Sequence, residues 1–134
     1  MKQIFLILTM ALALWVKPAK ADDAAIRQVI AAQIEAFKED DFGRAFTYAS
    51  PTIRNAFRTP ENFGAMVRQG YPMVWRPTDV RYLDARMVAG KLWQKVLVTD
   101  AKGARYLMDY RMIEVEGAWL IDAVQMLELP EVSV

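Results

Sequence analysis

Residues 104–127, ARYLMDYRMIEVEGAWLIDAVQML, decide the fold of this chain. Large apolar side chains alternate with polar ones on both sides of Glu116-Gly117, which is the period of a strand that is buried on one face. A two-residue connection ending in glycine is typical of a tight hairpin. The stretch therefore predicts two antiparallel strands, over residues 104–115 and 118–127.

The same pattern extends upstream of this hairpin. Residues 80–87 (VRYLDARM) and 92–99 (LWQKVLVT) also predict strands, joined at Ala89-Gly90 and followed by a turn over residues 100–103. The turns set a register in which Val96 lies opposite Met108 and Lys95 opposite Asp109. In the last hairpin the expected pairs are Val115–Ala118, Met112–Ile121, Arg111–Asp122 and Tyr110–Ala123.

The first half of the chain has helical spacing instead. Apolar residues from Ile26 to Phe37 recur every three or four positions, which predicts a long amphipathic helix beginning near Asp22. Short helices are expected after Asp41 and after the Ser50-Pro51 and Thr59-Pro60 pairs, because a capping residue followed by proline starts a helix. Residues 69–75, QGYPMVW, are expected to form an apolar loop. The fold class is α+β, a long helix and short helices packed in a curved, four-stranded antiparallel sheet.

The alternation also predicts two different sheet faces. One face is almost wholly apolar and should pack on the helices. The other combines large apolar residues with the charge pairs Lys95–Asp109 and Arg111–Asp122, and we expect a homodimer through it. The alternative is a monomer whose long charged side chains cover the patch. The predicted dimer residues are Trp93, Leu97, Leu107, Ile113 and Leu120, with Val124 on the same face.

The N-terminal segment has the layout of a secretory signal peptide. Lys2 precedes an apolar run from Ile4 to Val16, and Ala19-Lys20-Ala21 fits a cleavage site. The run is shorter than the roughly 20 residues that span a membrane. We expect residues 1–21 to be removed and residues 22–134 to form a single domain in the periplasm or outside the cell, without a membrane span. The alternative is an uncleaved N-terminal anchor.

Composition limits the chemistry of the exported domain. The chain has 17 Lys+Arg, 16 Asp+Glu, no His and no Cys, and the signal segment holds three of the basic residues and none of the acidic ones. The domain would therefore carry a net charge of −2, which argues against nucleic-acid binding. Without His or Cys there is no disulfide, thiol chemistry or zinc site built from those ligands. No cofactor or metal is expected, because paired acids such as Asp40-Asp41 are typical helix caps.

The order of elements and the late Gly117-Ala-Trp119-Leu-Ile121 stretch resemble the nuclear-transport-factor-two-like superfamily, with its ketosteroid-isomerase-like and cystatin-like cones. More specifically, the chain resembles a bacterial secreted family of unknown function. The matching stretches are AFTYASPTIRNAF (45–57), NFGAMVRQGYPMVW (62–75) and DYRMIEVEGAWLIDAVQ (109–125). The resemblance implies export and a cone with a pocket at its open end. It brings no established catalytic residues.

Two functions remain open on these grounds. The first is a non-catalytic module that binds an apolar small molecule or a protein partner. The second is a ketosteroid-isomerase-like acid–base enzyme that uses a pocket tyrosine and a carboxylate. The expected register leaves only Glu114 as an inward acid, which disfavours the enzyme. The candidate pocket residues are Tyr48, Arg54, Tyr71, Met73, Trp75, Tyr106 and Tyr110.

Overall fold

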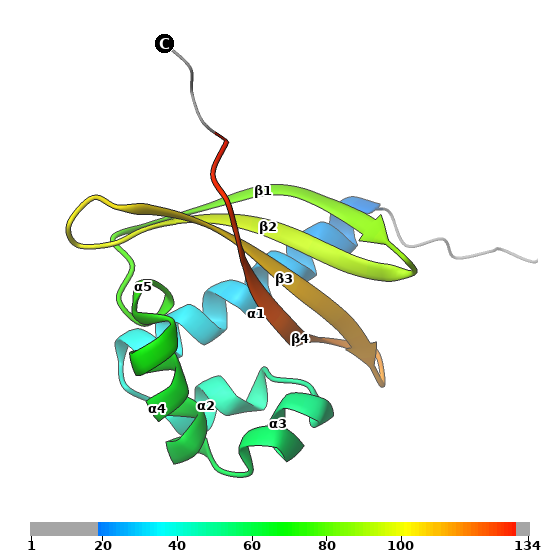
Figure 1. Ribbon diagram of the computed structural model, residues 1–134. Coiled ribbons are helices and arrows are strands. Elements are labelled where there is room, and N and C mark those ends of the chain that lie inside the picture. Colours follow the sequence, from blue (N-terminus) through cyan, green and yellow to red (C-terminus); the bar gives the residue numbers. More distant parts are fainter. Residues whose placement is uncertain (1–18, 131–134) are drawn as a thin grey trace, which may run out of the picture.

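A computed structural model describes residues 19–130, with side chains from residue 22 onward (Figure 1). Five helices precede four strands, so the α+β class is confirmed. The elements, in chain order, are α1 (Ala19–Lys38), α2 (Phe42–Thr47), α3 (Pro51–Phe57), α4 (Pro60–Gly70), α5 (Pro72–Trp75), β1 (Asp79–Val88), β2 (Lys91–Thr99), β3 (Arg105–Val115) and β4 (Ala118–Leu127).

The short helices begin where the capping residues predict. The side chains of Asp41, Ser50 and Thr59 each accept a hydrogen bond from a backbone N–H three residues further on. Pro51 and Pro60 occupy the first helical turn, where a backbone N–H would have no intrahelical partner. Local sequence therefore determines the starts of α2, α3 and α4.

The long helix α1 begins at Ala19, three residues before the predicted start at Asp22. Most of the predicted signal peptide lies outside the described residues, so its cleavage remains a prediction. Among the described helices, none is both long and apolar enough to cross a membrane.

The segment expected to be an apolar loop is partly helical, which corrects the prediction, because Pro72–Trp75 forms α5. Trp75 Nε1 donates to Asp40 Oδ1 at 2.9 Å, and the Arg76 guanidinium stacks 4.1 Å above the Trp75 ring and donates to the same Asp40 oxygen at 3.0 Å. The Trp75 hydrogen bond, with Arg76, holds the pKa of Asp40 below its ordinary value. The polar groups of Trp75 and Arg76 therefore hold α5 against the turn that follows α1.

The four strands form one antiparallel sheet in the order β1-β2-β3-β4. The β2–β3 register is the expected one, with Val96 opposite Met108 and Lys95 opposite Asp109. Glu116 and Gly117 both have positive φ, of 51° and 82°, as a two-residue hairpin turn of the favoured twist requires. The turn sequences therefore predict the strand order and most of the pairing.

The last hairpin departs from the expected register beyond its first pairs. Met112 does pair with Ile121, but Arg111 pairs with Ala123 and Tyr110 with Val124, so Asp122 is an extra, bulged residue of β4. The predicted ladder pairs Arg111–Asp122 and Tyr110–Ala123 are therefore wrong, although the side chains of Arg111 and Asp122 do form the expected ion pair at 3.0 Å. Val124, which was expected on the outer face, instead lies on the inner face beside Tyr110.

The physical reason for the bulge lies far away in the sequence. The segment around Ala49 runs along the free edge of β4 as an isolated parallel bridge. Ser50 N donates to Ile121 O at 2.8 Å, and Ile121 N donates to Tyr48 O at 2.9 Å. The bulge comes directly after the residue that makes both bonds. A pattern read from the hairpin alone contains no trace of this contact.

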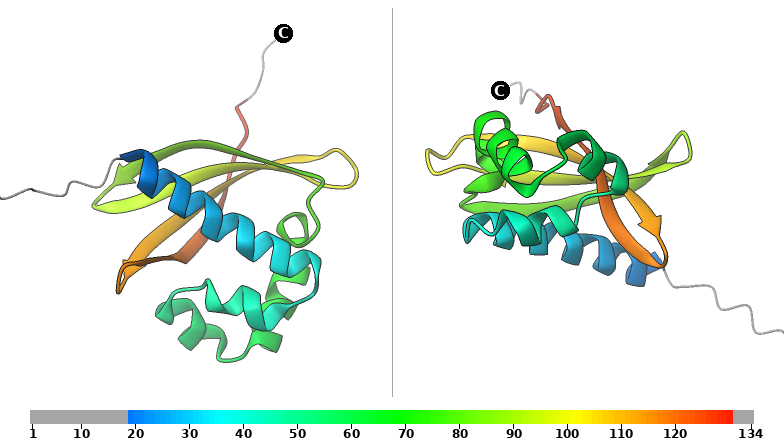
Figure 2. Two further views of the ribbon diagram at one scale, coloured as in Figure 1. Left: turned by 180° about the vertical axis from the view of Figure 1, so that it is seen from behind. Right: turned by 90° about the horizontal axis from the view of Figure 1, so that it is seen from below.

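The five described helices all cover one face of the curved sheet, and within residues 19–130 the other face carries no helix (Figure 2). Helix α1 runs beneath the strands, and α2, α3 and α4 form a layer farther from the sheet. The helices pack through an aromatic cluster in which the Phe63 ring lies 5.4–5.8 Å from the rings of Phe37, Phe46 and Phe57. Gly64 lets α4 approach α2 closely, because a Cβ there would lie 2.6 Å from the Phe42 ring.

Candidate functional site

A cavity of about 260 Å³ lies between the helices and the β3–β4 edge of the sheet. Its wall is mostly aliphatic and aromatic, and it includes residues from α1, α3, α4, α5, β3 and β4. The lining residues are Gln33, Phe37, Ala49, Ile53, Phe57, Phe63, Met66, Val67, Tyr71, Val74, Tyr110, Ile121, Asp122, Ala123 and Val124.

The depth of the cavity follows from the burial of its wall. Phe37, Phe63 and Val67 are almost fully buried, whereas Ile53 and Met66 are only half-buried. The half-buried residues of α3 and α4 therefore border the side that is open to solvent. Aromatic rings packed on one another are stiff, so they bound a space that flexible side chains would fill.

Tyr71 closes one end of the cavity. Its hydroxyl donates to the backbone carbonyl of Val124 at 3.4 Å, which links the end of α4 to the free edge of β4. The β4 bulge turns the Val124 side chain toward the same space. The cavity thus depends on the bulge, because without it Ala123 would take the inward position.

Gln33 is a buried polar residue of the wall, with an exposed fraction of 3%. Its Nε2 donates to the carbonyl of Ala45 at 3.2 Å. This bond ties α1 to α2. It uses one donor of the amide and leaves the side-chain carbonyl oxygen for other partners.

Tyr110 is fully buried, and its hydroxyl has no hydrogen-bond partner among the described residues. The side-chain oxygen of Gln94, directly across the β2–β3 ladder, is also sealed and without a partner. Burial raises the pKa of Tyr110 well above its ordinary value of 10.0. Tyr110 therefore remains neutral in the folded protein, and its ring forms part of the cavity wall.

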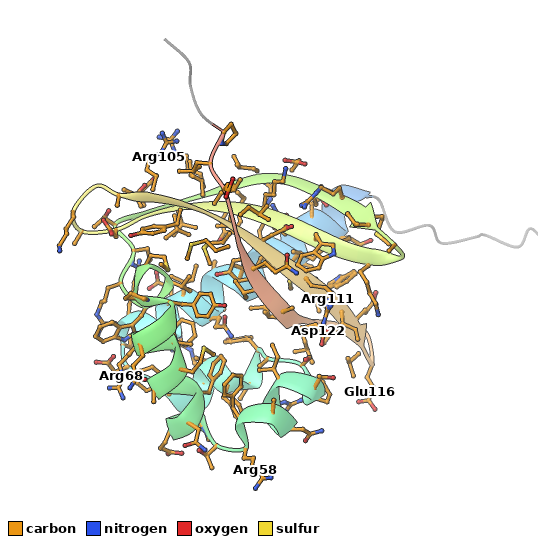
Figure 3. The ribbon with its side chains drawn as sticks, in the orientation of Figure 1. Arg58, Arg68, Arg105, Arg111, Glu116 and Asp122 are labelled. Atoms are coloured by element: carbon orange, nitrogen blue, oxygen red, sulfur yellow. The ribbon has the colours of Figure 1, made fainter. Side chains whose placement is uncertain are left out.

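Asp122 is one of the residues that border the cavity, but its carboxylate is paired with Arg111 toward the outer face of the sheet. It is the bulged residue, and its Oδ2 accepts a hydrogen bond from Arg111 Nε at 3.0 Å. Figure 3 shows the two side chains close together at the β3–β4 strands. The expected register also placed this side chain on the outer face, but it contained no bulge, because a bulge has no signal in a two-residue periodicity.

The structure brings together only some of the candidate pocket residues. Tyr71 and Tyr110 line the cavity, whereas Tyr48, Arg54, Met73, Trp75 and Tyr106 do not. Met73 is buried in the core, and the Tyr106 hydroxyl donates to Asp100 Oδ2 at 3.2 Å beside the β2–β3 turn. Most of the lining residues that were not expected from the sequence lie on helices. Gln33 and Phe37 could have been identified, because they share the apolar face of the long helix.

The expected dimer residues lie on the helix-free side of the sheet, under charged side chains. Arg86 makes two hydrogen bonds to Asp109, of 2.9 and 2.6 Å, and the Arg111 guanidinium lies 5.7 Å from the centre of the Trp93 ring. Leu97 and Leu107 are each only 8% exposed within the single chain. Dimerisation through Trp93, Leu97, Leu107, Ile113 and Leu120 remains a prediction.

The described part of the chain contains no cluster of three or more acidic residues arranged to hold a metal ion. The polar side-chain groups described at the cavity wall are instead the Gln33 amide and the Tyr71 hydroxyl. This arrangement can hold a small molecule by apolar contact and a few hydrogen bonds.

Two solved structures have a similar fold. One, designated Rd1NTF2_05 and carrying five substitutions, has a TM-score of 0.52 at 15% identity, over 80% of this chain and 98% of its own. The other, an NTF-2 like protein of unknown function from Burkholderia xenovorans LB400, has a TM-score of 0.50 at 14% identity, over 83% and 89%. The chain therefore has the NTF2-like fold, a cone in which the curved sheet wraps the helices.

No curated protein is a significant match to the chain. A family match, in contrast, extends over residues 19–134 and includes every helix and strand described above. Because it spans most of the sequence, the chain belongs to the family described as Domain of unknown function (DUF4864).

Proposed function

We propose that this protein is a non-catalytic binding module that holds a small apolar molecule in the cavity between the helices and β4. The observation that carries the proposal is the wall itself, a concave space of about 260 Å³ lined mainly by aliphatic and aromatic side chains. Ligand sites in proteins are typically concave, mostly apolar and furnished with a few polar groups.

The volume restricts the size of the occupant. Pockets for drug-sized ligands measure roughly 300–1,000 Å³, so this cavity suits a smaller molecule such as one with two fused rings. The rings of Phe37, Phe57 and Phe63 offer faces and edges to an aromatic ligand. Filling the space would also restore the contacts that an apolar void lacks, which is a source of binding energy.

Naphthalene is a suitable probe, because it is apolar, uncharged and small enough for the volume. We expect it to bind one site per chain with a dissociation constant of about 10⁻⁵ M, measured by isothermal titration calorimetry. Ile53→Trp places a large ring at the half-buried border of the cavity and should weaken binding at least about tenfold.

Asn55→Trp is the matched control for this titration. Asn55 lies on the same helix, is exposed, and does not line the cavity, so the same large ring should leave naphthalene binding unchanged. If naphthalene does not bind, or if both tryptophan variants bind it as the original chain does, the cavity is not a ligand site.

An acid–base enzyme is the second candidate, and one observation favours it. Asp122 and Tyr71 both border the cavity, and an acid beside a tyrosine is a residue combination that proton transfer in a pocket can use. The Asp122 carboxylate is, however, paired with Arg111 at 3.0 Å. This pair occupies the carboxylate, and the Tyr110 hydroxyl is sealed from the cavity, so we rank this function below binding.

A further inference from the structure

The chemistry of the cavity occupant can be narrowed from the orientation of one buried amide. Gln33 Nε2 faces the carbonyl oxygen of Ala45 at 3.2 Å. A carbonyl can only accept a hydrogen bond, so the nitrogen of the Gln33 amide must be the atom on that side. The side-chain oxygen, Oε1, is therefore turned away from Ala45.

Gln33 Oε1 is an acceptor without a donor among the residues that the structure describes. It is also not one of the atoms sealed from solvent without a partner, which are Gln94 Oε1 and Tyr110 OH. Since Gln33 as a whole is 97% buried and lines the cavity, the remaining access to its oxygen is from the cavity. A ligand there meets one free acceptor in an otherwise apolar wall.

The charges around the cavity select an uncharged ligand. Among the residues that the structure describes, no lysine or arginine lines the wall, and the one acidic residue that borders it, Asp122, is already paired with Arg111. The nearby Arg58 points away from the body of the protein in Figure 3. A carboxylate or phosphate group in the cavity would lose its hydration without gaining a counterion, which is strongly unfavourable.

We infer that the ligand is an uncharged, apolar, ring-containing molecule with one N–H or O–H group, which donates a hydrogen bond to Gln33 Oε1. The inference rests on the proposed function, since it concerns the same cavity. An analogue without the donor leaves the buried oxygen unpaired, so the site discriminates against it. An anionic analogue is excluded by the lack of a lining cation.

Three indoles test the two parts of this inference separately. Indole carries the donor, 1-methylindole lacks it, and indole-3-carboxylate keeps it but adds a negative charge. In calorimetric titrations at pH 7 of the protein purified after expression of the full chain, indole should bind about fivefold more tightly than 1-methylindole. It should bind at least about tenfold more tightly than indole-3-carboxylate.

Gln33→Met removes the acceptor and keeps a side chain of similar length. In this variant the affinity for indole should fall about fivefold, to that for 1-methylindole, which should itself be unchanged. Gln28→Met is the control, because Gln28 lies on the same helix, is exposed and does not line the cavity, so this variant should keep the full preference for indole. If Gln33→Met fails to fold, the titrations of the original chain with the three indoles still test the inference.

The outcomes separate this inference from the proposed function. The inference is overturned if indole and 1-methylindole bind equally well, or if indole-3-carboxylate binds more tightly than indole. If naphthalene binds in that case, the proposed function still stands. Loss of the preference in Gln28→Met as well as in Gln33→Met, or its retention in Gln33→Met, also overturns the inference. If naphthalene and all three indoles fail to bind, both proposals fall together.

Discussion

The two faces of the sheet are stabilised in different ways. On the inner face, Val96, Val98 and Met108 are completely buried against the helices, and the contacts are almost all apolar. On the outer face no described helix covers the strands, and the ion pairs Arg86–Asp109 and Arg111–Asp122 stand among large apolar side chains. The inner face nevertheless borders the cavity, whereas on the outer face the Leu97 and Leu107 residues are each only 8% exposed.

This difference teaches that apolar burial and ion pairing constrain a sheet in distinct ways. Apolar contact has no direction, so the inner face can leave a space where a ligand would bind. A buried ion pair needs a specific partner, and removing that partner leaves a charge without compensation. On the outer face, the effect of a substitution on the free energy of unfolding should therefore depend on which ion-pair partner is removed. On the inner side, it should depend on the change in side-chain volume.

The largest effect is expected for Asp109→Ala on the outer face. Asp109 is 3% exposed and accepts two hydrogen bonds from Arg86, so the substitution leaves the partly buried Arg86 guanidinium without its partner. We expect the free energy of unfolding to fall by about 3 kcal/mol, measured by urea denaturation. Asp79→Ala is the control, since the Asp79–Arg81 pair is well exposed and should contribute less than about 0.5 kcal/mol. Equal effects of the two substitutions would contradict the role given to burial.

A smaller effect is expected for Gly64→Ala in the helical layer. Alanine normally favours a helix, but a Cβ at this position would lie 2.6 Å from the Phe42 ring. We expect a loss of about 2 kcal/mol from overpacking, measured by thermal unfolding. Gly70→Ala serves as the control, because no atom lies within 4 Å of its Cβ position, and stability should change little. A stabilised Gly64→Ala variant would show that α2 and α4 can separate without cost.

The smallest effect is expected for Tyr110→Phe on the inner face, and it has the opposite sign. The Tyr110 hydroxyl is buried without a partner among the described residues, so its removal should raise the free energy of unfolding by about 1 kcal/mol. Burial raises the pKa of Tyr110 above 10.0, so the unfolded chain loses this proton first and stability falls as the pH rises above about 10.

Alkaline unfolding curves provide the second measurement on this variant. Tyr110→Phe should lose less stability between pH 9 and pH 11 than the original chain. Part of the dependence should remain, because burial also raises the pKa of Tyr82. Identical alkaline curves for the two proteins, or a less stable variant at pH 7, would mean that the Tyr110 hydroxyl has a partner in solution.

Most of the fold could be predicted because its signals are local. The caps at Ser50 and Thr59 act on N–H groups three residues away, and the Glu116-Gly117 turn joins strands that are adjacent in sequence. Each of these interactions is complete within a few residues. The sequence by itself therefore determined the fold class, the order of the strands, the β2–β3 register and the apolar character of the inner face.

The candidate site required the tertiary structure, because its parts are joined only by contacts between distant residues. The backbone hydrogen bonds that join Ile121 to Tyr48 and Ser50 accompany the bulge that brings Val124 to the cavity. Whether rings such as Phe63 fill a space or border one depends on the packing of several helices at once. Hydrophobic periodicity reports which face a residue occupies, but it contains no information on a long-range hydrogen bond or an unfilled volume.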